Sequence, residues 1–156
     1  MSFTTFSGPI RAGTVKDGAS RNAGLVVLSQ SYDSGDLTGA TTGNYDVAAM
    51  ILPAGAQIVD ITHDQVVAAT TGTTTVSVGT ASGGAQLSAA VATTAGGRFR
   101  GTATAATQLA WQLSTSADTT VYIRDVVGTA TLGAGRFITT VWYIQRSPAG
   151  LQHPAG

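Results

Sequence analysis

The chain has 156 residues, and its eight basic and eight acidic side chains give a formal charge of zero with only 10% of residues charged. This length predicts one domain with a core of its own, and the absence of Cys excludes disulfides and thiolate chemistry. The neutral balance lacks the broad positive surface that non-specific nucleic-acid binding needs, so we expect no nucleic-acid partner.

The residue types predict an all-β fold. There are 25 Thr and 20 Gly but no Glu, and Thr favours strands while Gly favours turns. The first residues lack a basic and then apolar signal pattern, and no stretch approaches 18 apolar residues, so we expect neither a secretory signal nor a membrane partner.

Three regions are predicted along the chain. Residues 1–23 contain SGPIRAGTVKDGASRNAG, which favours neither helix nor strand and predicts an extended N-terminal arm. Residues 24–146 alternate apolar runs with turn residues and predict a β-sandwich domain. Residues 147–156 contain two prolines and predict a C-terminal tail.

About eight short strands with turns between them predict a two-sheet antiparallel sandwich that is jelly-roll-like. A bulge or break is expected near His63, because neither face of its strand is cleanly apolar. One or two helical turns are expected within 82–97. The strands are expected at 24–32, 46–52, 57–70, 73–80, 98–105, 107–115, 119–128 and 136–146.

Period-two alternation is clearest in the later strands. The stretch 107–115 places Leu109, Trp111 and Leu113 on one face. In the last strand one face carries Phe137, Thr139, Val141 and Tyr143, and the other carries Ile138, Thr140, Trp142 and Ile144.

Few side chains are suited to catalysis or to metal binding. His153 is the fourth residue from the C-terminus, which leaves His63 between Asp60 and Asp64. On a regular strand the two carboxylates share a face and His63 points away, so a polar strand position is favoured over a metal or catalytic site.

Other polar patterns also have simple structural explanations. The stretch YDSGDLTG offers Asp33 and Asp36 to a hard cation but lacks the other ligands of a calcium loop, so a solvated loop is favoured. The Gly-rich pieces lack the Gly-Lys-Thr ending of a phosphate loop. We therefore expect no metal, no cofactor and no catalytic residue.

Two groups of side chains are candidates for contacts with other molecules. Arg98 and Arg100 either bind a carboxylate or anion, or charge an edge strand against wrong pairing. Trp111, Trp142 and Tyr143 are assigned to the core or a subunit interface, with a sugar-stacking platform as the alternative. Alternation places Trp142 and Tyr143 on opposite faces, so one of them is expected in the core.

Three segments resemble small structural proteins of tailed bacteriophages: MSFTTFSGPIRAGTV, then LPAGAQIVDITHDQV with TTTVSVGTASGGAQL, then GRFITTVWYIQ. The type that they resemble is the capsid decoration, or cement, protein. The resemblance implies a non-enzymatic protein made in the host cytoplasm and bound to the outer capsid surface of the virion. It also implies the major capsid protein as partner, and a homo-oligomer, with a trimer favoured.

This resemblance gives the arm a role, since an extended segment of some 22 residues reaches up to about 75 Å. We expect apolar anchors on the shell from Phe3, Phe6 and Ile10. We expect Arg11, Lys16 and Arg21 to contact acidic shell surface, and the alternative is an N-terminus packed on its own domain.

Three alternatives stay open. The first is a receptor- or glycan-binding module of a head fibre or tail tip, which exposed tryptophans beside a groove would favour. The second is a tail-tube subunit, which would assemble as rings. The third is a hydrolase, which needs His63 in a cleft within about 3.2 Å of Asp60 or Asp64.

Overall fold

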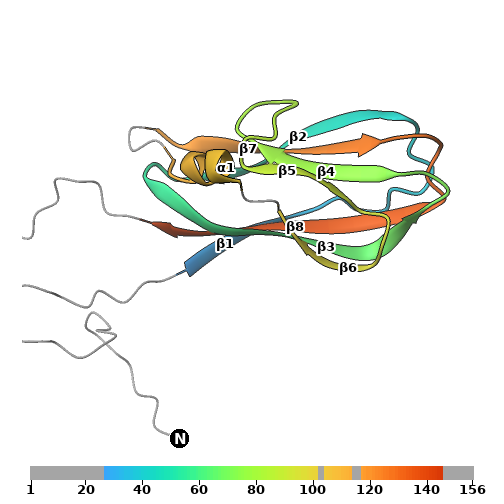
Figure 1. Cartoon of the computed structure of the whole chain (residues 1–156), viewed down its shortest axis with the longest axis horizontal. Helices are drawn as coiled ribbons and strands as arrows, with labels where there is room; N and C mark the ends of the chain where they lie inside the picture. The colour runs from blue at the N-terminus through green and yellow to red at the C-terminus, as the bar shows by residue number, and fades with distance from the viewer. Residues whose placement is uncertain (1–26, 102–103, 114–116, 146–156) are drawn as a thin grey trace, which may run out of the picture.

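The computed structural model describes residues 27–101, 104–113 and 117–145. These residues form two four-stranded sheets that lie face to face, with one short helix at one end (Figure 1). We call the sheets A and B. Sheet A has the order β1 (Val27–Asp33), β8 (Ala134–Gln145), β3 (Ala56–Thr70) and β6 (Gly97–Arg100). Sheet B has the order β2 (Gly43–Leu52), β7 (Thr119–Val127), β4 (Thr74–Gly79) and β5 (Ser88–Ala92).

The topology is that of a jelly roll. Every paired strand is antiparallel, and the chain passes between the sheets at each of its first connections, from β1 in sheet A to β2 in sheet B and back to β3. The long central strands β8 and β7 come last in the sequence and each lies between two earlier strands. The prediction of an all-β, jelly-roll-like sandwich with about eight strands is confirmed.

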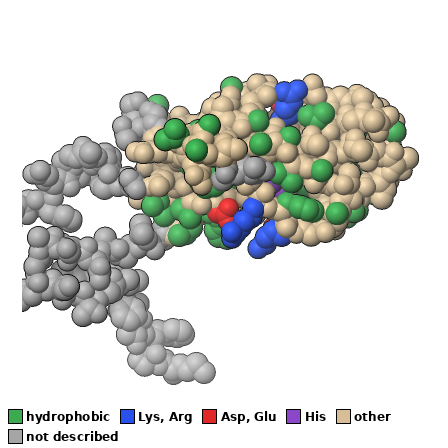
Figure 2. Space-filling model, in the orientation of Figure 1, with side chains coloured by type: hydrophobic (Ala, Val, Ile, Leu, Met, Phe, Trp, Pro, Cys, Tyr) green, Lys and Arg blue, Asp and Glu red, His purple; other side chains and the backbone are tan. Residues whose placement is uncertain are grey.

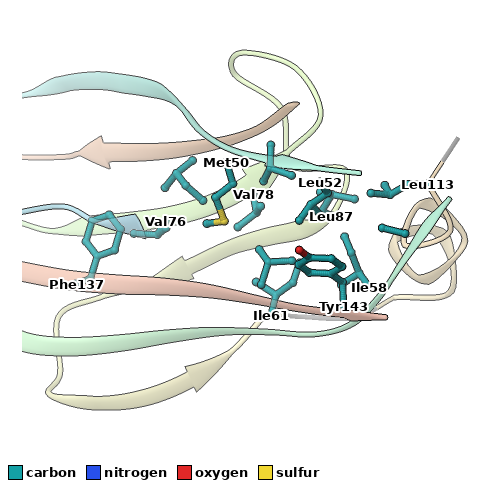
Figure 3. Packing of buried hydrophobic residues seen from close by; sticks show 14 residues of the cluster. Met50, Leu52, Ile58, Ile61, Val76, Val78, Leu87, Leu113, Phe137 and Tyr143 are labelled. Atoms are coloured by element: carbon teal, nitrogen blue, oxygen red, sulfur yellow. The ribbon is translucent and has the colours of Figure 1, made fainter. Parts of the chain in front are cut away.

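The main core lies between the sheets and towards the helical end. Figure 3 shows its side chains pointing from both sheets into the space between them. Leu87 is completely buried there, and Tyr143 is 6% exposed. A smaller apolar cluster of Ala69, Val127 and Leu132 fills another part of the interior. Burial of this apolar surface is the main force that holds the two sheets together.

The predicted alternation in the last strand is confirmed in β8. The buried row consists of Phe137, Thr139, Val141 and Tyr143, whose side chains face the interior. Trp142 lies in the opposite row and is 36% exposed. Because successive residues of a strand face opposite sides of a sheet, this row makes the outer surface of sheet A.

The strand expected at 107–115 is wrong where it is described. Ala105–Ala110 form the helix α1, whose N-cap is Thr104, and after the helix Gln112 makes only an isolated bridge to Gln57. The Thr104 hydroxyl accepts a hydrogen bond from the Thr107 amide, and the Thr107 hydroxyl accepts one from the Thr104 amide. This reciprocal capping favours the helix, and it leaves Leu109 80% exposed. No helix among the described residues is long and apolar enough to cross a membrane.

The helical turns expected within 82–97 are also wrong. This region contains β5, which pairs with β4, and no helix. Leu87 and Ser88 are completely buried at its start. Burial against the neighbouring strand outweighs the weak helical preference of the alanines, because sheet pairing satisfies the same backbone groups.

The bulge expected near His63 is displaced. His63 pairs regularly with Thr139 of β8 and with Phe99 of β6. The register shifts between β3 and β8 fall at Ile58/Asp60 and from Gln65 onwards. The strand is regular at His63, and its imidazole is completely buried.

Candidate functional site

A groove on the outer face of sheet A brings together several of the candidate side chains. Its volume is about 310 Å³. Four strands of sheet A contribute to it, with Trp142 from β8, Arg98 and Arg100 from β6, Val27 from β1, and Val59, Asp60 and Thr62 from β3. The register explains this convergence, because Asp60 lies opposite Trp142 and Thr62 lies opposite Arg100.

Both arginines of the groove are paired with aspartates of the neighbouring strand. Arg98 donates to both oxygens of Asp64, from Nε at 2.6 Å and from Nη2 at 3.1 Å. Arg100 Nε lies 3.2 Å from Asp60 Oδ2. Figure 2 shows acidic and basic side chains together on the face in view, with hydrophobic side chains near them. Both guanidinium groups are largely exposed, so they keep donors available to a carboxylate or hydroxyl of another molecule.

Trp142 is the aromatic component of the groove. It is 36% exposed, on a strand that has neighbours on both sides. Val59, which also lines the groove, is 48% exposed. An indole, a valine and two guanidinium groups form a surface that suits a protein or glycan contact, because aromatic and Arg side chains dominate binding energy at interfaces.

The other two aromatic candidates do not belong to this groove. Tyr143 is in the core, on the opposite face of β8 from Trp142, as the alternation predicts. Trp111 follows α1 and packs against the core, and its Nε1 donates to the Leu87 carbonyl at 2.7 Å. Their positions show that both rings stabilise the fold.

His63 does not meet the two aspartates beside it. Its Nδ1 lies 2.9 Å from Thr139 Oγ1 in the interior, while Asp60 and Asp64 are paired with arginines on the outer face. Burial lowers the pKa of His63 to about 4. In the described part of the chain no three His or carboxylate side chains come together as a metal site would require.

The carboxylates of the YDSGDLTG loop are engaged in local contacts. Arg136 donates to both oxygens of Asp33, and this pairing lowers the pKa of Asp33 to about 2. Asp36 accepts hydrogen bonds from the amide and hydroxyl of Thr38, which lower its pKa. The two carboxylates therefore stabilise the loop through local contacts and do not form a shared cation site.

A second cavity, of about 220 Å³, contains a residue that the sequence analysis missed. It lies by the edge strands β1 and β2 and is lined mainly by apolar and aromatic side chains. Asp125 of β7 lines it too, although this residue is only 6% exposed. The sequence could have indicated that Asp125 is buried, because period-two alternation in β7 places it in the same row as Val121 and Ile123.

The remaining candidates lie outside the described residues. These are the six side chains of the predicted arm, namely Phe3, Phe6, Ile10, Arg11, Lys16 and Arg21. His153 lies outside them as well.

Comparison with known proteins finds similarity at the level of structure. Neither a protein-family model nor a curated protein matches the sequence. A chain of the capsid of Ralstonia phage GP4 matches with a TM-score of 0.55 and 19% identity, over 85% of this chain and 93% of that one.

Two other solved structures give lower scores. A chain of the acidic stable capsid structure of Helicobacter pylori bacteriophage KHP30 has a TM-score of 0.48 at 18% identity, over 77% of this chain and 95% of that one. A chain of the cyanophage Pam1 capsid asymmetric unit has a TM-score of 0.43 at 19% identity, over 87% and 95%. At these identities the comparison with the Ralstonia phage chain shows a shared fold.

Proposed function

We propose that this protein is a non-enzymatic structural component of a bacteriophage virion. In this proposal it is a decoration protein that binds the outer surface of the capsid and stabilises the shell across the junctions of its subunits. The observation that carries the proposal is the fold shared with the capsid chain of Ralstonia phage GP4 over 85% of the present chain. The sequence resemblance to decoration proteins supports the same assignment.

The arrangement of the polar side chains supports a role without chemistry. Each of the four described arginines is paired with an aspartate, and the hydrogen-bond partner of the buried His63 ring is the Thr139 hydroxyl. A hydrolase would need His63 beside Asp60 or Asp64, but these residues lie on opposite faces of β3. The polar groups that are described therefore serve the fold and its surface.

A decoration protein acts through the free energy of binding, because separating two shell subunits then also requires breaking its contacts. The groove with Trp142 supplies one surface for such a contact. Phe3, Phe6 and Ile10, with Arg11 beside them, supply a second in the N-terminal segment. A trimer that binds at three equivalent points would gain affinity through effective concentration, so that each contact can be weak.

The test is the copy number of this chain in purified virions, relative to the major capsid protein, by quantitative mass spectrometry. We expect hundreds of copies in a simple ratio to the shell subunit. Release of the protein should then lower the temperature at which the particles lose their DNA. A few copies per particle would refute the assignment to the shell surface and place the protein on the tail or a fibre.

One observation favours a second candidate function, a receptor- or glycan-binding module. Trp142 is exposed beside a groove that also holds Arg98 and Arg100, and an indole flanked by hydrogen-bond donors suits stacking against a sugar ring. The test is binding to a glycan array by the wild type and by Trp142→Ala, with Leu109→Ala as the control for loss of an exposed apolar side chain. Equal binding by all three proteins would count against this function.

A further inference from the structure

Asp125 is a carboxylate in an otherwise apolar row. Val121, Ile123 and Val127 precede and follow it on the inner face of β7, and each is at most 1% exposed. Asp125 itself is 6% exposed, and its Oδ1 has no hydrogen-bond partner among the described residues. Burial raises the pKa of this carboxyl to about 6. A buried carboxylate oxygen without a partner is costly, so this position calls for a cation or a donor.

The cavity beside Asp125 has the shape and lining for such a group. Its volume of about 220 Å³ is below the roughly 300–1,000 Å³ typical of pockets for drug-sized ligands, and it suits a single side chain. Tyr32, Tyr45 and Phe137 provide aromatic walls. Apolar walls accept the alkyl stem of a Lys or Arg side chain, and aromatic faces attract its charged end.

In the described part of the chain, every arginine is already paired with an aspartate other than Asp125. Arg124, although it is on the same strand as Asp125, is paired with Asp46. The four pairs are Arg98–Asp64, Arg100–Asp60, Arg124–Asp46 and Arg136–Asp33. The chain's one lysine, Lys16, and its other arginines lie outside the described residues.

The N-terminal segment is the longest part of the chain outside the described ranges, and it carries three of the four remaining basic residues. It leads directly into β1, and Tyr32 of β1 lines the cavity five residues after Val27. That distance along a strand is about 17 Å. Arg21 lies six residues before Val27 and Lys16 eleven, which correspond to extended lengths of about 20 Å and 38 Å. Both side chains can therefore return to the cavity of the same chain.

We propose that the cavity lined by Asp125 is a binding site for a basic side chain of the N-terminal segment, supplied by Lys16 or Arg21. The cation pairs with the Asp125 carboxylate while its alkyl stem packs against the aromatic walls. The segment is thereby fastened between the edges of the two sheets. This site is distinct from the groove on sheet A, and the proposal does not depend on what the protein binds in a virion.

The test is a titration of Asp125 in the full-length protein, followed by the ¹³C chemical shift of its carboxyl carbon from pH 3 to 8. The resonance is assigned with Asp125→Asn. An opposite charge within about 4–6 Å lowers the pKa of a carboxyl by 1–3 units, so the variant K16Q/R21Q should show an Asp125 pKa at least about one unit higher than the wild type.

The matched control is R11Q/R146Q, which removes the same two charges from other places outside the described residues. It should leave the Asp125 pKa within a few tenths of a unit of the wild type. The proposal is overturned if K16Q/R21Q titrates like the wild type, or if both double variants shift Asp125 equally. In the latter case the effect is that of net charge, which a specific contact does not explain. Because no shell is present, the result is independent of the proposed function.

Discussion

His63 should make the protein sensitive to acid in a way that a single substitution can isolate. The imidazole is completely buried, and burial lowers its pKa from 6.5 to about 4. Well above pH 6.5 the ring is neutral in both the folded and the unfolded chain, and its effect on stability does not change with pH. As the pH falls through 6.5, His63 becomes protonated in the unfolded chain but stays neutral in the folded chain. The free energy of unfolding therefore decreases progressively down to about pH 4.

The size of this loss follows from the pKa difference. A shift of about 2.5 units corresponds to about 3 kcal/mol at 1.36 kcal/mol per unit. This is a large part of the 5–15 kcal/mol that typically separates folded from unfolded domains. The substitution His63→Gln keeps an amide that can hydrogen-bond Thr139 Oγ1 but cannot titrate. We expect it to cost about 1–2 kcal/mol at pH 8, because it disturbs a buried site, and to remove most of the dependence on acid.

The assay is equilibrium denaturation in urea at half-unit steps from pH 4 to pH 8, followed by tryptophan fluorescence. The measured quantity is the difference in unfolding free energy between the wild type and His63→Gln, which should shrink or change sign as the pH falls. His153→Gln, the substitution of the only other histidine, is the control and should follow the wild type.

Asp125 acts in the opposite direction over part of the same range. Burial raises its pKa to about 6, so without a cationic partner it favours the folded state as the pH falls from 6 towards 3.8. Its contribution is common to both proteins and cancels from their difference. Parallel pH curves for the wild type and His63→Gln would refute the reasoning, because they would mean that His63 is protonated with equal ease in both states.

Three further predictions concern stability and the domain boundary. Leu87→Ala should cost about 2–5 kcal/mol in urea denaturation because Leu87 is completely buried, whereas Leu109→Ala should change stability by less than about 0.5 kcal/mol; equal effects would contradict the described core. Thr104→Ala should cost about 1 kcal/mol by removing the N-cap of α1, and an unchanged denaturation midpoint would show that the cap adds nothing. Deletion of residues 2–22 should leave circular dichroism in the far ultraviolet unchanged in shape, and an unfolded product would refute the division into arm and domain.

The architecture was predictable from alternation where a strand is long and has one buried face. In β8 the inner and outer rows follow the apolar pattern of the sequence, and Tyr143 and Trp142 separate as expected. The helix α1 was missed for a physical reason. Leu109, Trp111 and Leu113 have the spacing of a strand face, and the cap formed by Thr104 and Thr107 lacks the Glu or Gln that usually marks such a motif in a sequence.

The composition of the groove could not be predicted in the same way. Trp142, Arg98 and Asp60 are far apart in the sequence, on the strands β8, β6 and β3. The sequence does not say which of these strands are neighbours in the sheet. Their meeting depends on the register of β3 with both β6 and β8. The ion pairs of the two arginines depend on that register too, which is why the sequence left open whether their partners lie within the chain or outside it.

The whole chain is neutral, but its charges are unevenly distributed between the N-terminal segment and the described body. Residues 27–145 contain four arginines and seven aspartates, a formal charge of −3, whereas residues 1–26 contain three basic residues and one aspartate, a formal charge of +2. At 0.15 M ionic strength exposed charges are screened within about 8 Å, so this asymmetry acts mainly through direct contact. The proposed contact of Lys16 or Arg21 with Asp125 brings the basic segment onto the acidic body. Val27, where the segment meets the body, lines the groove with Trp142, and Tyr32, farther along the same strand, lines the cavity with Asp125. A segment held at Asp125 in the way proposed would therefore start beside the groove and end at the cavity.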